Sequence, residues 1–97
     1  MDYKVVMLNK AERDLCEILD YKTQFYPGTA DRFIDEFKKK RESIAENPYM
    51  YQVYIHNKKY RRAIVLDYLM FYRVFDQSNI VRIYRILNGK IDLNKYI

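Results

Sequence analysis

Apolar positions in the first half of the chain follow a short strand and then a helical stripe. Residues 3–8 are rich in β-forming side chains and predict a strand. Residues 10–26 repeat apolar side chains every three or four positions, which is the period of an α-helix. Asn9 and Glu12 resemble a capping box, so this helix is expected to begin at Lys10.

A second helical stripe follows a break at Pro27-Gly28. Thr29 is placed to cap this helix, and the helix should end at Asn47-Pro48 because proline disfavours helical backbone in the residue before it. The two helices are therefore expected to form a hairpin. Charged side chains of the first helix are expected to point mostly outward: Glu12, Arg13, Asp14, Glu17 and Asp20.

The apolar pattern changes to that of β-strands in the second half of the chain. Three β-rich segments are joined by tight connections, of which the first is Asp67-Tyr68, and they predict an antiparallel meander: residues 60–66, 69–75 and 80–87. Residues 49–59 have no clear period and predict a loop or a weak strand. Residues 91–97 follow an Asn-Gly turn and predict an edge strand or a terminal tail.

This element order predicts one α+β domain over residues 1–97, with two helices on one face of a mostly antiparallel sheet. The other face is expected to stay open. Basic side chains are expected to rim that face, where they could hold a phosphate backbone beside stacking tyrosines: Arg61, Arg62, Arg73, Arg82, Arg85 and Lys90.

Charge is distributed unevenly and narrows the choice of partners. Residues 1–48 carry nine Lys/Arg and ten Asp/Glu, whereas residues 49–97 carry nine and three, so a net charge of −1 is followed by +6. A basic half favours nucleic acid, an anionic membrane or an acidic protein, although a soluble basic protein without such a partner has the same composition. No apolar run spans a bilayer and no secretory signal is visible, so we expect a cytoplasmic protein with no membrane partner.

Metal and cofactor chemistry is not expected from this sequence. One cysteine and one histidine cannot assemble a zinc-like cluster, and no glycine-rich phosphate loop is present. Cys16 is expected to be a small buried apolar side chain on the first helix. His56 could act as a general base, but an isolated loop histidine is more often ordinary surface.

Two segments of the second half resemble RelE/ParE-superfamily toxins of type II toxin–antitoxin systems, which include plasmid stabilisation proteins. The hallmark is Phe71-Tyr72-Arg73-Val74 after a basic strand, followed by a strand that ends Ile83-Tyr84-Arg85-Ile86-Leu87-Asn88-Gly89-Lys90-Ile91-Asp92. The resemblance implies an N-terminal strand, a helical hairpin and a curled antiparallel sheet. It also implies a cognate antitoxin as partner.

The superfamily has at least two activities, and the resemblance leaves both open. RelE-like members resemble ribosome-dependent endoribonucleases, also called mRNA interferases. These inhibit translation by cutting mRNA, and the cleavage would need no metal. ParE-like members bind DNA gyrase and are not known as nucleases. A catalytically weakened toxin, or a binding module that only docks an acidic peptide, is a further alternative. The basic, tyrosine-rich sheet favours RNA binding and therefore mRNA cleavage.

Site residues implied by the resemblance support that activity only in part. Arg62 matches a basic residue that stabilises phosphate charge, and the other candidate catalytic residues are Arg73, Arg85 and Tyr96. Candidate RNA contacts are Lys58, Lys59, Arg61 and Lys90. Related nucleases often have Arg or His at three positions where this chain has other residues, namely Leu69, Asn88 and Ile91. Arg73 and Arg85 could equally be structural and pair with an acid such as Asp92.

Overall fold

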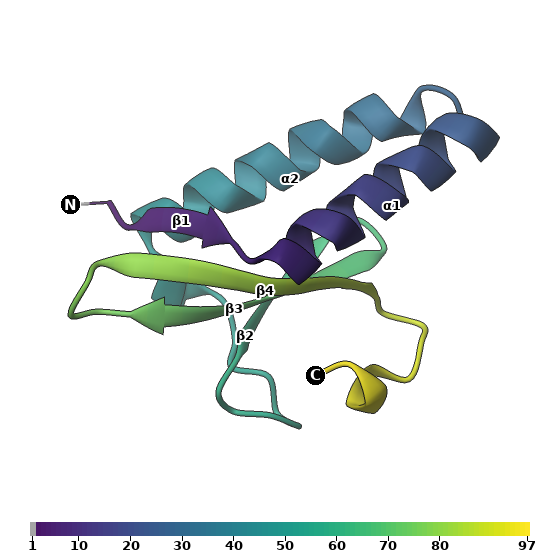
Figure 1. Cartoon of the computed structure of the whole chain (residues 1–97). Coiled ribbons are helices and arrows are strands. Elements are labelled where there is room, and N and C mark those ends of the chain that lie inside the picture. The colour runs from purple at the N-terminus through teal and green to yellow at the C-terminus, as the bar shows by residue number, and fades with distance from the viewer. Residues whose placement is uncertain (1) are drawn as a thin grey trace.

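The computed structural model describes residues 2–97 and has the α+β architecture expected from the sequence (Figure 1). Its elements, in chain order, are β1 (Lys4–Met7), α1 (Asn9–Phe25), α2 (Thr29–Glu46), the short 3₁₀ helix η1 (Pro48–Met50), β2 (Arg61–Val65), β3 (Tyr68–Phe75), β4 (Ile80–Asn88) and the 3₁₀ helix η2 (Leu93–Lys95). The predicted strand, helical hairpin and meander are all confirmed.

The sheet has the strand order β1-β4-β3-β2, in which only the β1–β4 pair is parallel. Both helices lie across one face of this sheet (Figure 1). The main core lies between these two layers, where Phe33 and Ile44 of α2 pack with Val65, Tyr72 and Ile83 of the strands. Because these side chains alternate along their strands, the intervening residues point to the opposite face.

Both predicted helix caps are wrong by one residue. Asn9 is the first residue of α1, and Leu8 takes the cap position with extended backbone and no side-chain bond. Gly28 caps α2 at φ 94°, a left-handed conformation that glycine adopts without steric cost. The Thr29 hydroxyl donates instead to the Tyr26 carbonyl at 2.7 Å. The chain therefore turns tightly between the helices and uses the glycine, not the threonine, to do so.

The sheet face opposite the helices is less open than expected from the sequence. A second core of Tyr54, Phe71 and Leu87 lies there, and Leu93 and Ile97 pack against it. The segment after β4 is thus a tail with a short 3₁₀ helix and not an edge strand, and Figure 1 shows it under the sheet. Apolar side chains of the loop before β2 and of the tail exclude water from the centre of this face.

A β-bulge in β4 changes which side chains reach that face. Tyr72 pairs with Ile83 and Phe71 pairs with Arg85, so Tyr84 has no partner in the register. A bulge places two consecutive side chains on one side of a strand. Tyr84 and Arg85 therefore both lie opposite the helices, although strict alternation would separate them.

Cys16 and the loop between β2 and β3 both differ from the prediction. Cys16 is exposed, so the prediction of a buried cysteine is wrong. Leu15, the residue before it, packs on the main core, and one further residue along the helix turns the Cys16 side chain away from that core.

The loop between β2 and β3 consists of Leu66 and Asp67, because Tyr68 already belongs to β3. Across residues 2–97, no helix is long and apolar enough to cross a membrane.

Candidate functional site

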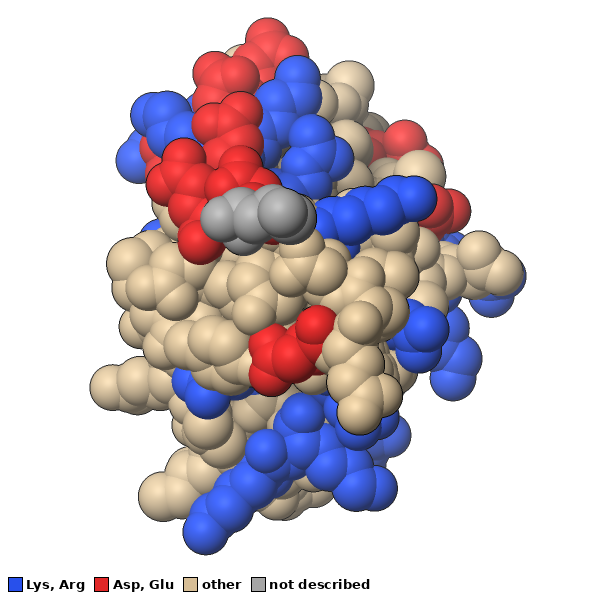
Figure 2. Space-filling view, turned by 90° about the vertical axis from the view of Figure 1, so that its left-hand side faces the viewer, with Lys and Arg blue, Asp and Glu red and all other residues tan. Residues whose placement is uncertain are grey.

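The face opposite the helices combines an apolar centre with a basic rim. Phe71 and Leu87 form the centre together with Tyr54. The rim consists of strand arginines on the same side: Arg62, Arg73, Arg82 and Arg85. In Figure 2, basic side chains without acidic neighbours gather at the bottom of the view, away from the helices, whereas acidic and basic side chains are mixed at the top. The charge asymmetry of the sequence is therefore also an asymmetry of the surface.

Arg62 lies at the outer edge of this face, on β2. Its Nη2 donates to Oε1 of Gln52 across a long 3.5 Å contact, so the guanidinium is only weakly held. The side chain lines a cavity of about 290 Å³ together with Lys40, Met50 and Ile64. Arg62 can thus contact an anion, and Lys40 of α2 adds a second positive charge to the same cavity.

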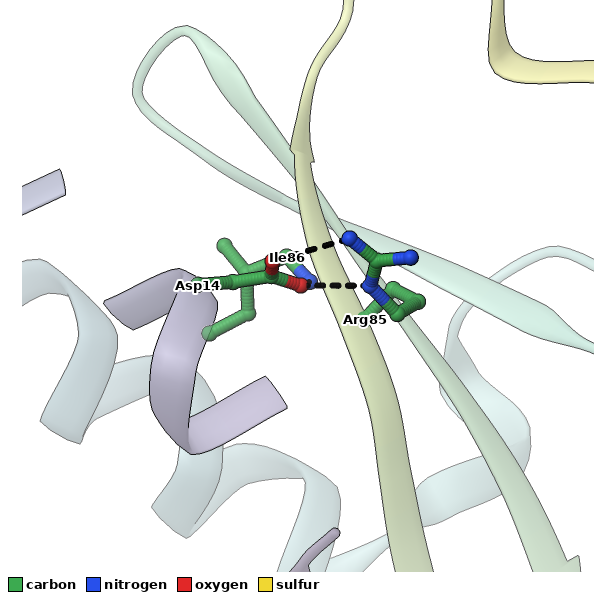
Figure 3. Close-up of polar contacts among 3 residues, drawn as sticks. All are labelled: Asp14, Arg85 and Ile86. Carbon is green, nitrogen blue, oxygen red and sulfur yellow. Dashed lines mark hydrogen bonds and ion pairs between the residues drawn. The ribbon is translucent and has the colours of Figure 1, made fainter. Parts of the chain in front are cut away.

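Arg85 is bound to α1 by a carboxylate that sequence reasoning placed in solvent. Asp14 accepts hydrogen bonds from Nε and Nη2 of Arg85 at 2.7 and 2.9 Å, and from the backbone N–H of Ile86 at 3.0 Å (Figure 3). Only 19% of the Arg85 side chain and 11% of the Asp14 side chain are exposed. This hydrogen bonding raises the pKa of Arg85. The partner of Arg85 is therefore Asp14 and not Asp92, whose side chain accepts from the N–H of Asn94.

A signal for Asp14 was present in the sequence. The residue lies three positions after Ala11 and four before Ile18, both of which are buried in the main core. Side chains at these spacings share one helix face. A carboxylate on that face must find a partner, because an unpaired buried charge is costly.

Arg85 and Tyr96, which are both predicted site residues, lie close together in the structure. The Arg85 Cζ lies 5.5 Å from the centroid of the Tyr96 ring. Both line a cavity of about 260 Å³, to which Tyr60 and Tyr84 contribute further aromatic rings. The start of α1 closes the cavity with Lys10. Arg85 and Tyr96 also line a neighbouring cavity of about 280 Å³ with Tyr21 and Tyr68.

Arg73 lies elsewhere on the face, directly opposite Arg82 of β4. Its Cζ is 5.1 Å from the ring centroid of Phe75, and that of Arg82 is 4.5 Å from the same ring. Neither guanidinium has an ion-pair partner among residues 2–97. Arg73 is thus not paired with an acid, unlike Arg85.

Arg61 does not belong to the open face. It alternates with Arg62 and pairs with Tyr72 of the main core, so it points toward the helix side. Its Nη1 donates to the Tyr51 carbonyl at 2.8 Å, and its Cζ lies 4.9 Å from the Tyr49 ring. The expectation that Arg61 rims the open face is therefore wrong, and its contacts are structural.

The predicted lysine contacts are dispersed. Lys58 and Lys59 are exposed in the loop before β2. Lys90 is exposed after β4 and lines a different cavity with Tyr21 and Lys22 of α1. The lysines therefore do not converge with Arg62, and their role in binding stays a prediction.

Asp76, in the turn between β3 and β4, is held by two tyrosines. The hydroxyl of Tyr3 donates to Oδ1 at 2.7 Å, and the hydroxyl of Tyr49 donates to Oδ2. These bonds lower the pKa of Asp76 and raise the pKa of Tyr49 to about 12. The carboxylate nearest in sequence to the arginine pair is thus already occupied.

The groups on this face can bind an anion more readily than they can move a proton. None of the strand residues that point to it is Asp, Glu or His, and arginine stays protonated at any physiological pH. Arg62 and Arg85 flank Phe71 from β2 and β4, two strand spacings or about 9.5 Å apart. Cleavage of a phosphodiester needs acid and base groups within hydrogen-bond reach of one phosphate. The predicted catalytic residues do not have that arrangement.

The fold has been observed in toxin–antitoxin complexes. The chain superposes on a chain from the chromosomal ParDE system of P. aeruginosa with a TM-score of 0.73 and 16% identity, covering 89% of this chain and 95% of that one. For the RelBE2 complex of Mycobacterium tuberculosis the TM-score is 0.63 at 20% identity, covering 91% and 99%. For the E. coli RelBE complex it is 0.65 at 14%, covering 92% and 99%. These likenesses define a RelE/ParE-type fold.

The sequence itself then assigns the family. A family model described as "ParE toxin of type II toxin-antitoxin system, parDE" matches residues 5–93. The chain therefore belongs to the ParE toxin family and is the toxin component of a type II toxin–antitoxin system. No curated protein sequence matches it significantly.

Proposed function

We propose that this toxin arrests growth by binding DNA gyrase and does not cut RNA. The observation that carries the proposal is the exposed apolar edge of the open sheet face beside Arg62, where Met50 and Ile64 are 55% and 53% exposed. Ile64, Leu69 and Phe71 lie beside Arg62, where a nuclease needs groups that carry charge or exchange protons. An apolar patch with a basic rim is instead the composition of a protein-binding surface. The resemblance to ParE-like toxins, which bind gyrase, supports the same choice.

The test compares the two targets with one protein preparation. In a supercoiling assay, the purified chain is expected to inhibit gyrase. In a translation reaction programmed with a defined mRNA, primer extension is expected to find no new transcript ends. Ribosome-dependent cuts together with unaffected gyrase would overturn the proposal.

Arg62→Ala, checked for folding by circular dichroism, asks whether this face is the one used. It is expected to weaken gyrase inhibition, because Arg62 is held only by the long contact to Gln52 and lines the cavity beside the exposed Ile64. The matched control is Lys39→Ala. Lys39 is exposed on α2 and pairs only with Glu36, so its loss removes the same charge from the opposite side of the molecule. Equal inhibition by both variants would assign gyrase binding to another surface.

Ribosome-dependent mRNA cleavage is the second candidate, and one observation favours it. His56 lies in the loop that packs on the open face, with its ring 5.4 Å from that of Tyr54. An exposed imidazole there could act as a general base toward a ribose hydroxyl. His56→Ala separates the two activities, since it should abolish RNA cleavage and leave gyrase inhibition unchanged.

A cognate antitoxin belongs to the same proposal. The structurally similar toxins named above were solved in complexes or systems with antitoxins. This chain also exposes about half of each of three neighbouring aromatic side chains at the end of α1, namely Tyr21, Phe25 and Tyr26. Exposed apolar clusters often mark binding surfaces. Co-expression with the protein encoded beside the toxin gene should yield a stable complex and restore growth, and a toxin that co-purifies with nothing and stays toxic would contradict this.

A further inference from the structure

Arg73 and Arg82 form an unusual pair on the open face. They are direct cross-strand partners on β3 and β4, so their side chains leave the same side of the sheet. Like charges directly opposite one another destabilise a sheet. Both guanidiniums lie over the ring of Phe75, at 5.1 and 4.5 Å from its centroid. The shared ring holds two positive charges together at one place on the surface.

The structure provides this pair with no counter-ion. Within the described residues neither arginine forms an ion pair. The carboxylate of Asp76 in the adjoining turn accepts instead from Tyr3 and Tyr49. Lys4 of β1 adds a further charge: its neighbour Val5 packs in the main core, so Lys4 points to the same side as the arginines. This surface therefore carries positive charge that an anion from another molecule can neutralise.

Tyrosine rings lie next to this cationic pair. The Arg73 Cζ is 5.9 Å from the centroid of the Tyr84 ring, and Tyr84 meets Tyr60 edge to face with centroids 5.2 Å apart. Both tyrosines also line the cavity of about 260 Å³. The bulge that points Tyr84 to this face thus places an aromatic pocket beside two guanidiniums.

We propose that this surface binds an unpaired segment of nucleic acid, with a phosphate on Arg73 and Arg82 and the adjacent base against Tyr84 and Tyr60. Guanidiniums bind phosphate oxygens through paired N–H donors, and aromatic rings bind bases by stacking. An acidic peptide would use the arginines and leave the tyrosines without a planar partner. A duplex keeps its bases stacked on one another and unavailable to the pocket. The inference is independent of the gyrase proposal, because it concerns a nucleic-acid contact of the toxin alone.

The test is fluorescence anisotropy with the full chain and a labelled oligothymidylate, at several salt concentrations. Arg73→Gln/Arg82→Gln is expected to weaken binding at least about ten-fold and to reduce the salt slope by about 0.7 for each lost phosphate contact. Tyr84→Leu is expected to weaken binding about five-fold or more, and Tyr84→Phe to retain it, because a phenyl ring still stacks.

Matched controls decide what the losses mean. Lys38→Gln/Lys39→Gln removes the same charge from α2, on the other side of the sheet, and should change affinity less than about two-fold if contact and not net charge binds the strand. Equal losses in both double variants would overturn the proposal. Equal affinity for a duplex of the same sequence would also overturn it. A third contrary outcome would be that polyglutamate displaces the oligonucleotide equally well from the wild type and from Tyr84→Leu, because an acidic peptide would then be the better fit. The anisotropy assay contains neither gyrase nor ribosomes. A negative result would therefore overturn the nucleic-acid contact and leave the proposal of gyrase as the target unaffected.

Discussion

Asp14→Asn tests whether the ion pair between α1 and β4 stabilises the fold. The substitution keeps the shape of the side chain and removes its charge. Asp14 accepts three hydrogen bonds, two from Arg85 and one from the backbone N–H of Ile86, and both side chains are more than four-fifths buried. An amide oxygen can accept only part of this set, and the amide N–H groups would face the Arg85 donors.

The magnitude follows from these contacts. Hydrogen bonds to charged groups contribute roughly 1.5–3 kcal/mol, and removing one partner of a buried pair costs about 3–5 kcal/mol. Because part of each side chain still reaches water and the amide retains some bonding, we expect Asp14→Asn to lower the free energy of unfolding by about 2 kcal/mol. For a chain of this size that corresponds to a fall in Tm of roughly 8–16 °C.

Urea denaturation followed by circular dichroism measures the change. Asp20→Asn is the matched control, because Asp20 is an exposed acid on the same helix and should change stability by less than about 0.5 kcal/mol. A double-mutant cycle compares the stability lost by Arg85→Met, by Asp14→Asn and by the double variant. Because the two residues contact each other, the double variant is expected to lose less stability than the sum of the two single losses. If Asp14→Asn is no more destabilising than the control, the stabilising role assigned to the pair is refuted.

Three further predictions concern other contacts. Asp76→Asn should destabilise the chain near neutral pH, because it removes the negative charge and replaces one of the two oxygens that accept from the Tyr3 and Tyr49 hydroxyls with an amide NH₂ group. Since the folded state lowers the pKa of Asp76, this stabilisation is present above the ordinary value of 3.8 and is lost as pH falls through the lower folded value. Thermal melts at a series of pH values should therefore show wild type and variant converging in acid, and a constant difference would contradict this origin. Tyr72→Phe leaves the buried Pro48 carbonyl without its 2.7 Å bond and should cost about 1–2 kcal/mol in urea denaturation, whereas an unchanged midpoint would show that the bond contributes nothing. Gly28→Ala meets no atom within 4 Å but must adopt φ 94°, so it should cost about 1 kcal/mol by the same assay, and a stabilised variant would refute the backbone argument.

The candidate site could be predicted from sequence only in part. The expectation of a basic open face is correct for Arg62, Arg73 and Arg82, which point away from the helices. The same reasoning could not place Arg61, because neighbouring arginines point to opposite faces and the register alone decides which one is exposed. It also could not show that Arg85 is neutralised, since Asp14 lies 71 residues away in the chain.

Local sequence patterns are enough to predict the elements and the family. Helical spacing over residues 10–26, the break at Pro27-Gly28 and the β-rich segments after residue 59 are local properties, and the structure reproduces them. Helix caps were less predictable, because several residues at each helix start can satisfy the first N–H groups.

Tertiary structure decided which charges remain available to a partner. Arg85 is held by Asp14 from α1, whereas Arg73 and Arg82 share a ring and have no acidic partner among residues 2–97. It also decided that the tail covers the apolar centre of the open face. Charge pairing and burial depend on contacts between distant segments, which periodicity along the chain does not encode.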